Sequence, residues 1–382
     1  MAHQTNYDVV VIGAGPAGSR TARLLADRGY RVVILERDAA VGLPVHCTGV
    51  VSAECMQRYD IPESLVIDSI KSFVLRSPHG HAVDIKRKDV QAYVLDRVSL
   101  DRHLADQAVA TGAELMTSVE ATAVQWDGKN VRVACRGGNV QELTGRIAIL
   151  ATGYGSALAR SLGFGGGAEV VSGAQVVVEA SSVRGLEVFT GKDTGKGGFG
   201  WLLPWKPGLA LVGILTRKHT VRYLQEQIDR LQEQGKIGEV RETFRCRPVP
   251  LEVAKVAVYD GILGVGDVVG QVKPTTGGGI YFGLLGADIA GEVIHDALLA
   301  GDATAAALQP YEIEWRKLME PEIRGGYLLR RLGEQLPETV VEQLHRLLRI
   351  PALRRIFVSA RPSYDWHSTG LLRVLDRFQR YS

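Results

Sequence analysis

The sequence predicts an α/β fold in which a parallel sheet flanked by helices is interleaved with a second domain built on an antiparallel sheet, followed by a helical C-terminal region. Buried, β-branched strands at residues 7–12 and 31–36 flank a helix, and similar strands return much later, at 147–153 and 262–267. Between them, residues 168–255 are mostly strand-like. We therefore expect segments that are far apart in the sequence to complete one sheet.

The 382 residues divide into three predicted parts, and no low-complexity linker separates them. The boundaries are 1–70, 96–165 and 256–305 for the first domain, 71–95 and 166–255 for the second domain, and 306–382 for the helical region. In the second domain, FGWLLP and LALVGIL flank a turn that ends at Gly208, which predicts a hairpin. A helix is expected near 220–234.

Composition and cysteine usage exclude several classes of protein. With 46% hydrophobic and 23% charged residues, the chain has the composition of a globular protein. Its four cysteines form no CxxC pair, so we expect neither a disulfide scaffold nor a metal site. No basic region precedes the first apolar run, and no window offers the ~20 apolar residues that cross a bilayer. We expect a cytoplasmic protein without a nucleic-acid partner, and leave peripheral membrane association open.

The first strand is followed at once by GAGPAG, a GxGxxG motif between a strand and a helix. In this motif, the first glycine allows a tight turn, the second lets the backbone approach a pyrophosphate, and the third allows close helix–strand packing. The phosphates then meet the helix N-terminus. The residues assigned to this dinucleotide site are Gly13, Gly15, Pro16, Ala17 and Gly18. A glycine-rich turn without a ligand is the other interpretation, which the flanking elements disfavour.

The elements after the motif agree with dinucleotide binding. The helix is predicted from Pro16 to Arg28, and Gly29 stands where a left-handed C-cap belongs. At the end of the second strand, Glu36 can accept hydrogen bonds from a ribose diol. Its charge would repel a 2′-phosphate, which favours FAD or NAD over NADP.

A second glycine segment lies at the end of the strand at 147–153. Ala151, Thr152 and Gly153 form a turn of small residues where a neighbouring strand can pass close to the same dinucleotide. Taken alone, such a turn is also typical of any strand that stops at a glycine. We include these three residues in the predicted cofactor site because of their place in the sheet.

A third segment, from Gly264 to Ile280, favours FAD over NAD. Asp267 follows a strand, and its carboxylate can accept hydrogen bonds from ribityl hydroxyls. Three successive glycines open a helix predicted from about Gly278, whose N–H groups can face a flavin carbonyl. The residues assigned here are Gly266, Asp267, Pro274, Gly277, Gly278, Gly279 and Ile280.

With these segments, and with LDRVSLDRHL, HCTGVV and FGWLLP, the whole chain resembles the geranylgeranyl reductase family of flavoproteins, a branch of the fold of p-hydroxybenzoate hydroxylase. The resemblance adds Cys47 and Arg97 to the predicted cofactor site, to which Arg37, next to Glu36, is also assigned. It implies that hydride transfer from reduced FAD reduces isoprenoid double bonds in the geranylgeranyl chain of a lipid, a diphosphate or a quinone. No second GxGxxG motif for a nicotinamide cofactor is visible. The electron donor would therefore be NAD(P)H that binds only transiently, or a ferredoxin.

The predicted substrate residues are Phe199, Trp201, Leu203 and Pro204. The first three alternate along one strand, so all can face one side of a sheet and line an apolar slot. Ordinary sheet core is the other interpretation. The usual family form of this stretch is YxWxFP, so Phe and Leu here replace Tyr and Phe. These departures leave the identity of the alkene open.

The resemblance makes Cys47 the candidate catalytic residue, because it places the matching cysteine near the flavin. A thiol there could donate a proton to the alkene, and the neighbouring His46 could tune its pKa. Cysteine is also often buried for packing alone, which is the alternative role.

Two further functions of the same fold stay open, namely an FAD-dependent aromatic monooxygenase and a halogenase. An electron-transfer flavoprotein is disfavoured because the cysteines do not form an iron–sulfur segment. Residues 324–382 hold 11 Arg and 5 acidic residues, in clusters such as LLRRL that suit a helix lying on anionic lipid. A solvated helix face is the alternative interpretation of these clusters.

Overall fold

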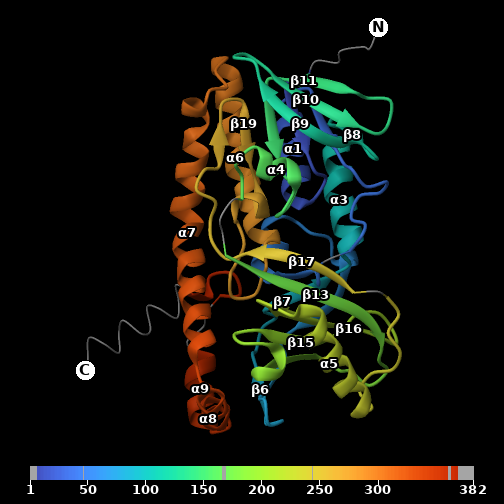
Figure 1. The fold of residues 1–382 in the computed structure, drawn as a ribbon, viewed down its shortest axis with the longest axis vertical. Helices are drawn as coiled ribbons and strands as arrows, with labels where there is room; N and C mark the ends of the chain where they lie inside the picture. The colour runs from blue at the N-terminus through green and yellow to red at the C-terminus, as the bar shows by residue number, and fades with distance from the viewer. Residues whose placement is uncertain (1–6, 46, 166–168, 243, 360–362, 369–382) are drawn as a thin grey trace, which may run out of the picture.

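The computed structural model describes residues 7–45, 47–165, 169–242, 244–359 and 363–368. Figure 1 shows an elongated molecule with one sheet and its helices in the upper half and a second sheet in the lower half. The long helix α7 runs along one side of both halves. The predicted α/β class, with two interleaved sheets and a helical C-terminal region, is confirmed.

The upper sheet has six strands in the order β18-β19-β12-β1-β2-β8. Their bounds are Val9–Ile12 (β1), Val32–Leu35 (β2), Glu114–Met116 (β8), Ile147–Leu150 (β12), Val258–Tyr259 (β18) and Ile262–Gly264 (β19). All neighbours pair in parallel except β18 and β19. Strands β1, β2 and β12 are buried along their whole length, which explains their unbroken Val, Ile and Leu runs.

Helices and a small meander cover this sheet. Helix α1 packs between α3 and α6, and α6 also packs on α7. Strands β9, β10 and β11 form an antiparallel sheet whose middle strand contacts β12. The bounds are Pro16–Ala26 (α1), Arg97–Ala110 (α3), Ile280–Ala300 (α6), Ala305–Gln335 (α7), Glu120–Trp126 (β9), Val131–Arg136 (β10) and Glu142–Gly145 (β11).

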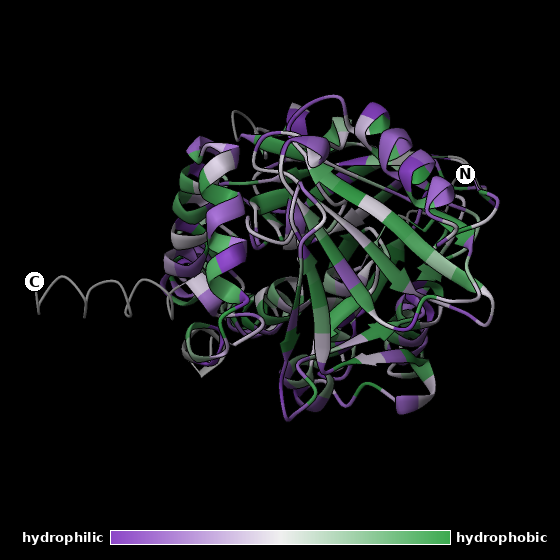
Figure 2. Ribbon diagram, turned by 90° about the horizontal axis from the view of Figure 1, so that it is seen from below, coloured by the Kyte–Doolittle hydropathy of each residue, from purple (hydrophilic) through white to green (hydrophobic). Residues whose placement is uncertain are grey.

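The lower sheet has seven strands in the order β17-β13-β16-β15-β14-β5-β6, all antiparallel except the β14–β5 pair. Helix α5 (Thr220–Glu233) packs on one face. The bounds are Ser72–Arg76 (β5), Ala82–Lys86 (β6), Val170–Glu179 (β13), Leu186–Thr190 (β14), Phe199–Pro204 (β15), Leu209–Thr216 (β16) and Arg245–Pro250 (β17). In Figure 2 the strands are largely hydrophobic, whereas outer helices carry hydrophilic bands.

Smaller elements complete the fold. Strand β7, which falls in the predicted 71–95 segment, pairs with β3 and β4 rather than with the seven-stranded sheet. The bounds are Val50–Ser52 (β3), Val66–Ile70 (β4), Ala92–Leu95 (β7), Ala53–Arg58 (α2), Ala157–Ser161 (α4), Glu338–Leu348 (α8) and Pro351–Ser359 (α9). Among the described residues, no helix is long and apolar enough to cross a membrane.

Helix α7 is anchored to the upper sheet through its buried face. Trp315 and Tyr311 are fully buried, and the Tyr311 hydroxyl donates to the Gly264 carbonyl at 2.7 Å. Gln271 donates in turn to the Tyr311 hydroxyl at 3.0 Å. The first half of helix α7 is therefore part of the structural core.

The packing of Gly18 generates a stability prediction. A Cβ added at Gly18 would lie 2.1 Å from the Gly13 carbonyl oxygen, whereas a Cβ added at Gly15 meets nothing within 4 Å. We expect Gly18→Ala to lower the free energy of unfolding of the ligand-free protein by about 1–3 kcal/mol, the usual cost of overpacking. Gly15→Ala should lower it by less than Gly18→Ala does, because the added methyl group meets nothing and only the preference for glycine over alanine at an N-cap is lost. Urea denaturation measures both, and equal effects would contradict the packing role.

Candidate functional site

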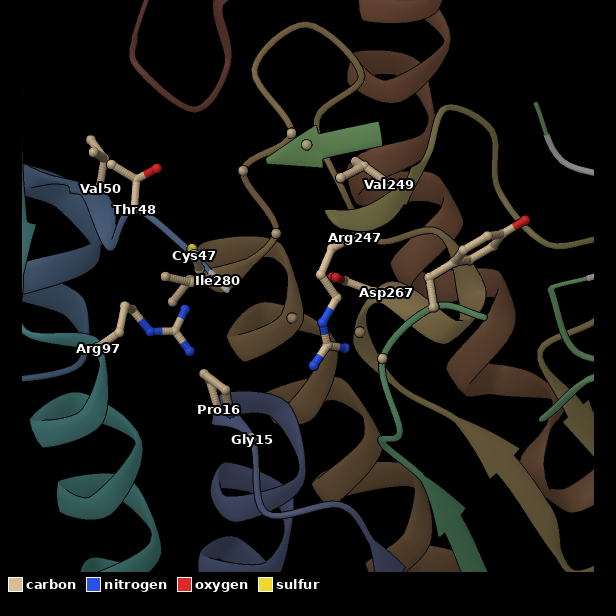
Figure 3. Close-up of a pocket in the computed structure, with 18 of the residues that line it drawn as sticks. Gly15, Pro16, Cys47, Thr48, Val50, Arg97, Arg247, Val249, Asp267 and Ile280 are labelled. Atoms are coloured by element: carbon tan, nitrogen blue, oxygen red, sulfur yellow. The ribbon is translucent and has the colours of Figure 1, made fainter. Parts of the chain in front are cut away.

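A cavity of about 1400 Å³ lies between the two sheets. The carboxyl ends of β1, β2, β12 and β19 border it on one side, as ligand sites in open α/β sheets generally are. Strands β5, β6, β14 and β15 line it on the other side. Figure 3 shows part of the lining, with Pro16, Arg97 and Arg247 around this space.

All but three of the residues predicted for the site line this cavity. Those that do are Gly13, Gly15, Pro16, Ala17, Glu36, Arg37, Cys47, Arg97, Ala151, Thr152, Gly153, Phe199, Trp201, Leu203, Gly266, Asp267, Gly277, Gly278, Gly279 and Ile280. Gly18 packs against strand β1 instead. Pro274 uses its carbonyl to accept from Arg330 at 3.2 Å, and Pro204 ends strand β15 opposite Ala210.

The glycine turn after β1 is shaped by the neighbouring strand β12. Gly13 has φ +110°, and a Cβ there would lie 2.5 Å from the Ala151 carbonyl oxygen. Only glycine fits both the conformation and the space. Gly15 faces open space before helix α1, whose first turn has Pro16 at its start. This leaves room for a ligand to approach the helix N-terminus.

The Glu36 carboxylate is held by two backbone donors. Its Oε2 accepts from the Ala14 N–H at 3.0 Å, and its Oε1 accepts from the Asp38 N–H at 3.0 Å. These bonds tie the end of β2 to the glycine turn and fix the carboxylate at the cavity wall. The carboxylate oxygens retain lone pairs that can accept from a ribose diol.

Asp267 lies in a 3₁₀ turn, Gly266–Val269, and not directly at the end of β19 as expected. Burial raises the pKa of its carboxyl to about 6, although Arg97 and Arg247 lower it. A Cβ at Gly279 would lie 2.5 Å from Asp267 Oδ1, so the glycine makes room for this carboxylate.

The glycine run leads directly into helix α6, which begins two residues later than the predicted start at about Gly278. The helix begins at Ile280 with Gly279 as its N-cap, because Gly277 has φ +74° and interrupts helical geometry. The Gly277 N–H donates to the Lys273 carbonyl at 2.8 Å and closes a turn. The three glycines therefore have three different roles. Gly277 adopts a left-handed turn, Gly278 lies against the Lys273 side chain, and Gly279 leaves room for the Asp267 carboxylate.

Arg97 also lines the cavity, and its guanidinium is 2.6 Å from the Asp101 carboxylate. Burial opposes its charge, but Asp101 and then Cys47 raise the pKa of Arg97 above its ordinary value. Within the described part of the chain, Arg97 Nε is buried without a hydrogen-bond partner. Cys47 lies beside this guanidinium and its Sγ accepts from the Gly49 N–H at 3.4 Å. The neighbouring His46 lies outside the described residues.

The apolar wall is one face of the lower sheet. Phe199, Trp201 and Leu203 all line the cavity, while Leu202 between them is buried in the core under α5. A Cβ at Gly213 would lie 2.1 Å from the Trp201 indole, so the ring lies flat over this glycine. The rings of Phe199 and Trp201 are 5.8 Å apart. Alternation along β15 thus exposes these side chains to the cavity, as predicted.

Several cavity residues were missed from the sequence. Arg247 on β17 lies near Pro16 and Asp267 in Figure 3. Its pKa is lowered, mainly by burial and to a smaller extent by repulsion from Arg37. Thr48 donates to Gln175 at 2.8 Å, which joins the Cys47 loop to β13. Contacts between segments that are distant in the sequence bring these residues to the site, and no local sequence motif predicts them.

A C-terminal strap, residues 363–368, closes another side of the cavity. Its Tyr364 and His367 line the cavity, and Thr275 bonds to His367. Lys273 Nζ is 2.5 Å from Asp365 Oδ1, and the two side chains are only 3% and 1% exposed. Because a buried pair cannot be broken without stranding a charge, this contact fixes the strap on the glycine segment.

The burial of Asp267 generates a prediction about pH. Its pKa of about 6 exceeds the ordinary ~3.9 of an unfolded chain, so ionisation destabilises the folded state as pH rises from about 4 to 6. Ligand-free Asp267→Asn should be more stable than wild type by about 1–3 kcal/mol at pH 7, with the difference lost near pH 4. Urea unfolding across this range measures it. A difference that is constant with pH would contradict the assignment.

Comparison with known proteins identifies the family. Residues 6–322 match the family model described as FAD binding domain. Digeranylgeranylglycerophospholipid reductase 2 of Methanothermobacter thermautotrophicus is 33% identical over 356 residues, covering 90% of this chain and 91% of the relative. Digeranylgeranylglycerophospholipid reductase 1 of Methanopyrus kandleri is 32% identical over 362 residues, covering 90% and 94%.

Two solved structures share the fold. A geranylgeranyl bacteriochlorophyll reductase-like protein from Thermoplasma acidophilum superposes with a TM-score of 0.84 at 22% identity, covering 96% of this chain and 99% of that one. A flavin-dependent brominase superposes with a TM-score of 0.71 at 15% identity, covering 99% and 100%. At these identities the structures speak for the fold, whereas the sequence relatives and the family model decide the family. The chain belongs to the geranylgeranyl reductase family of FAD-dependent oxidoreductases.

Proposed function

We propose that this flavoenzyme reduces carbon–carbon double bonds in the geranylgeranyl chain of a lipid, a diphosphate or a quinone. The observation that carries this proposal is the apolar face with Phe199, Trp201 and Leu203, which lines the same cavity as the cofactor-binding segments. A chain of isoprene units can lie on such a face and exclude water from the reacting carbons. The names of the relatives, digeranylgeranylglycerophospholipid reductases, support the same substrate class.

The residues present fit FAD. In this proposal the Gly15 turn would hold the pyrophosphate, Glu36 the ribose and Asp267 the ribityl chain. Arg97, with a buried Nε that lacks a partner within the described part of the chain, supplies a donor on the far side. When bound and reduced, FAD supplies a hydride to one carbon of the double bond.

Cys47 is our proposed proton donor for the other carbon. Its Sγ–H would transfer a proton to that carbon, and the resulting thiolate would take up a proton from solvent. The Arg97 guanidinium beside Cys47 would stabilise the thiolate between these two transfers. Thr48, bonded to Gln175, fixes the loop that carries Cys47.

The electron donor in this proposal is NAD(P)H or a ferredoxin. The glycine motif at Gly13 would be occupied by FAD, so the donor would approach the oxidised flavin only transiently. Chemical reduction replaces either donor in the experiment below.

We also propose peripheral contact with an anionic membrane through helices α7, α8 and α9. Leu328 and Leu332 on α7 are 54% and 58% exposed, whereas the adjacent Arg330 is buried and bonds to Pro274. Exposed apolar residues continue along these helices at Leu336, Leu344, Leu347, Ile350 and Leu353. Exposed arginines stand among them at Arg331, Arg346 and Arg349. Apolar and cationic side chains together suit anionic lipid.

An anaerobic assay tests the proposed reaction. FAD is reduced with dithionite, the excess reductant is removed, and a geranylgeranylated lipid is added without oxygen. We expect flavin reoxidation together with a product that has gained two hydrogens per double bond, measured by absorbance and mass spectrometry. Reoxidation that requires oxygen and yields a hydroxylated or halogenated product would instead support a monooxygenase or a halogenase.

The same assay tests Cys47. Loss of a general acid typically costs about 10²- to 10⁴-fold in rate, so we expect Cys47→Ala to lower kcat by that order while FAD stays bound. Cys246→Ala is the matched control, since Cys246 is exposed and does not line the cavity. Undiminished turnover in Cys47→Ala would contradict the proposed proton transfer and would leave packing as the role of this residue.

A further inference from the structure

The hairpin β5–β6 presents an apolar face that ends in two cations. Phe73 and Leu75 on β5 and Ile85 on β6 all line the cavity. Phe73 is paired with Ile85, and Lys71 and Arg87 lie two residues further along the same side of the hairpin, just beyond the paired strands. The Arg87 N–H donates to the Lys71 carbonyl at 2.9 Å, so the two cations stand directly opposite each other.

Lys71 and Arg87 both line the cavity, although Lys71 is exposed to solvent. This end of the cavity therefore opens at the surface. Neither side chain forms an ion pair within the described ranges of the chain. Ser72 and Gln91 line the same end and add a hydroxyl and an amide. The opening thus offers several hydrogen-bond donors, two of them charged.

The cross-strand register connects this opening to the proposed substrate face. Leu75 pairs with Val188, which pairs in turn with Trp201, so these three form one row across the sheet. Lys71 lies four residues along β5 from that row and two strands away from Trp201. From standard strand dimensions, the separation of Lys71 from Trp201 is roughly 16 Å. This apolar path is short enough for an extended geranylgeranyl chain to reach Trp201 from a headgroup at Lys71.

We propose that Lys71 and Arg87 form a subsite for the phosphate or diphosphate of a prenylated substrate. The inference deepens the proposed function and rests on it. A guanidinium can hold two phosphate oxygens at once, and an ammonium adds a compact charge. With the anion held at the opening, the chain runs over Phe73 and Leu75 toward Trp201. An uncharged quinone tail gains nothing from these cations, so the subsite selects phosphorylated isoprenoids among the three substrate classes.

The test compares charged and uncharged substrates in the FAD-loaded enzyme. Lys71→Gln, Arg87→Gln and the double variant are assayed anaerobically with geranylgeranyl diphosphate, a geranylgeranylated glycerol phosphate lipid and geranylgeraniol. Lys86→Gln is the matched control, because Lys86 precedes Arg87 on the same strand, is exposed and does not line the cavity. KM and kcat are determined for each substrate, and binding to the oxidised enzyme is measured separately as Kd.

We expect the double variant to raise KM and Kd about tenfold for a phosphorylated substrate, with kcat kept, because charge-assisted hydrogen bonds are lost at a partly exposed site. Geranylgeraniol and the Lys86→Gln control should show no change. High salt should weaken the binding of the phosphorylated substrates to the wild-type enzyme, and it should have no such effect on the double variant. A response confined to the diphosphate identifies the free diphosphate as the ligand, and one confined to the lipid identifies the lipid headgroup.

Equal effects on geranylgeraniol and on the phosphorylated substrates would overturn the subsite, as would no effect of the double variant. The binding arm separates this failure from failure of the proposed function. If wild type reduces no prenyl substrate yet binds diphosphate through Lys71 and Arg87, the reaction is wrong and the subsite stands. If wild type reduces all three substrates with the same KM as the double variant, the reaction stands and the subsite is wrong.

Discussion

The close approach of helix α1 to strands β1 and β12 is the constraint on which the site depends. Because Gly18 has no side chain, the helix comes close to the strand, and its N-terminus then points into the cavity at Gly15. The Glu36 carboxylate fixes the same turn by accepting from Ala14. The parallel register of β12 with β1 brings Ala151 against Gly13 and completes the cradle. A dinucleotide site follows from this contact, since backbone N–H groups and the helix dipole are left facing open space.

Charges buried around this cradle give the site its electrostatic character. Arg97 and Arg247 come from two different parts of the fold and both act on Asp267, which burial would otherwise keep protonated. Such an arrangement destabilises the ligand-free protein and becomes useful when hydroxyl and phosphate groups are present to satisfy it. Lys273 and Asp365 add a second buried pair that fastens the C-terminal strap. The strap therefore belongs to the site although it lies near the end of the chain.

The lower sheet contributes a surface rather than reactive groups. One of its faces is core under α5, and the other runs from Trp201 across Val188 to the β5–β6 hairpin. An apolar surface of this kind gives a long isoprenoid binding energy without directional contacts, so the cationic pair at Lys71 and Arg87 would supply the orientation that the surface lacks. Cys47 lines the same cavity beside Arg97, and the proposed reaction would need a proton donor there.

The sequence by itself determined the α/β class, the dinucleotide motif and the alternation that places Phe199, Trp201 and Leu203 on one side of a strand, because each depends on local spacing along one segment. Only the structure showed that this side lines the cavity. The sequence did not show that Gly277 adopts a left-handed conformation or that Gly279 leaves room for the Asp267 carboxylate, because positive φ and side-chain room are set by neighbours in space. Only the tertiary structure decided the positions of Arg247, Tyr364, Lys71 and Arg87. Their places depend on strand register and on a strap folded back across the molecule, and contacts between distant segments leave no periodic signal in the chain.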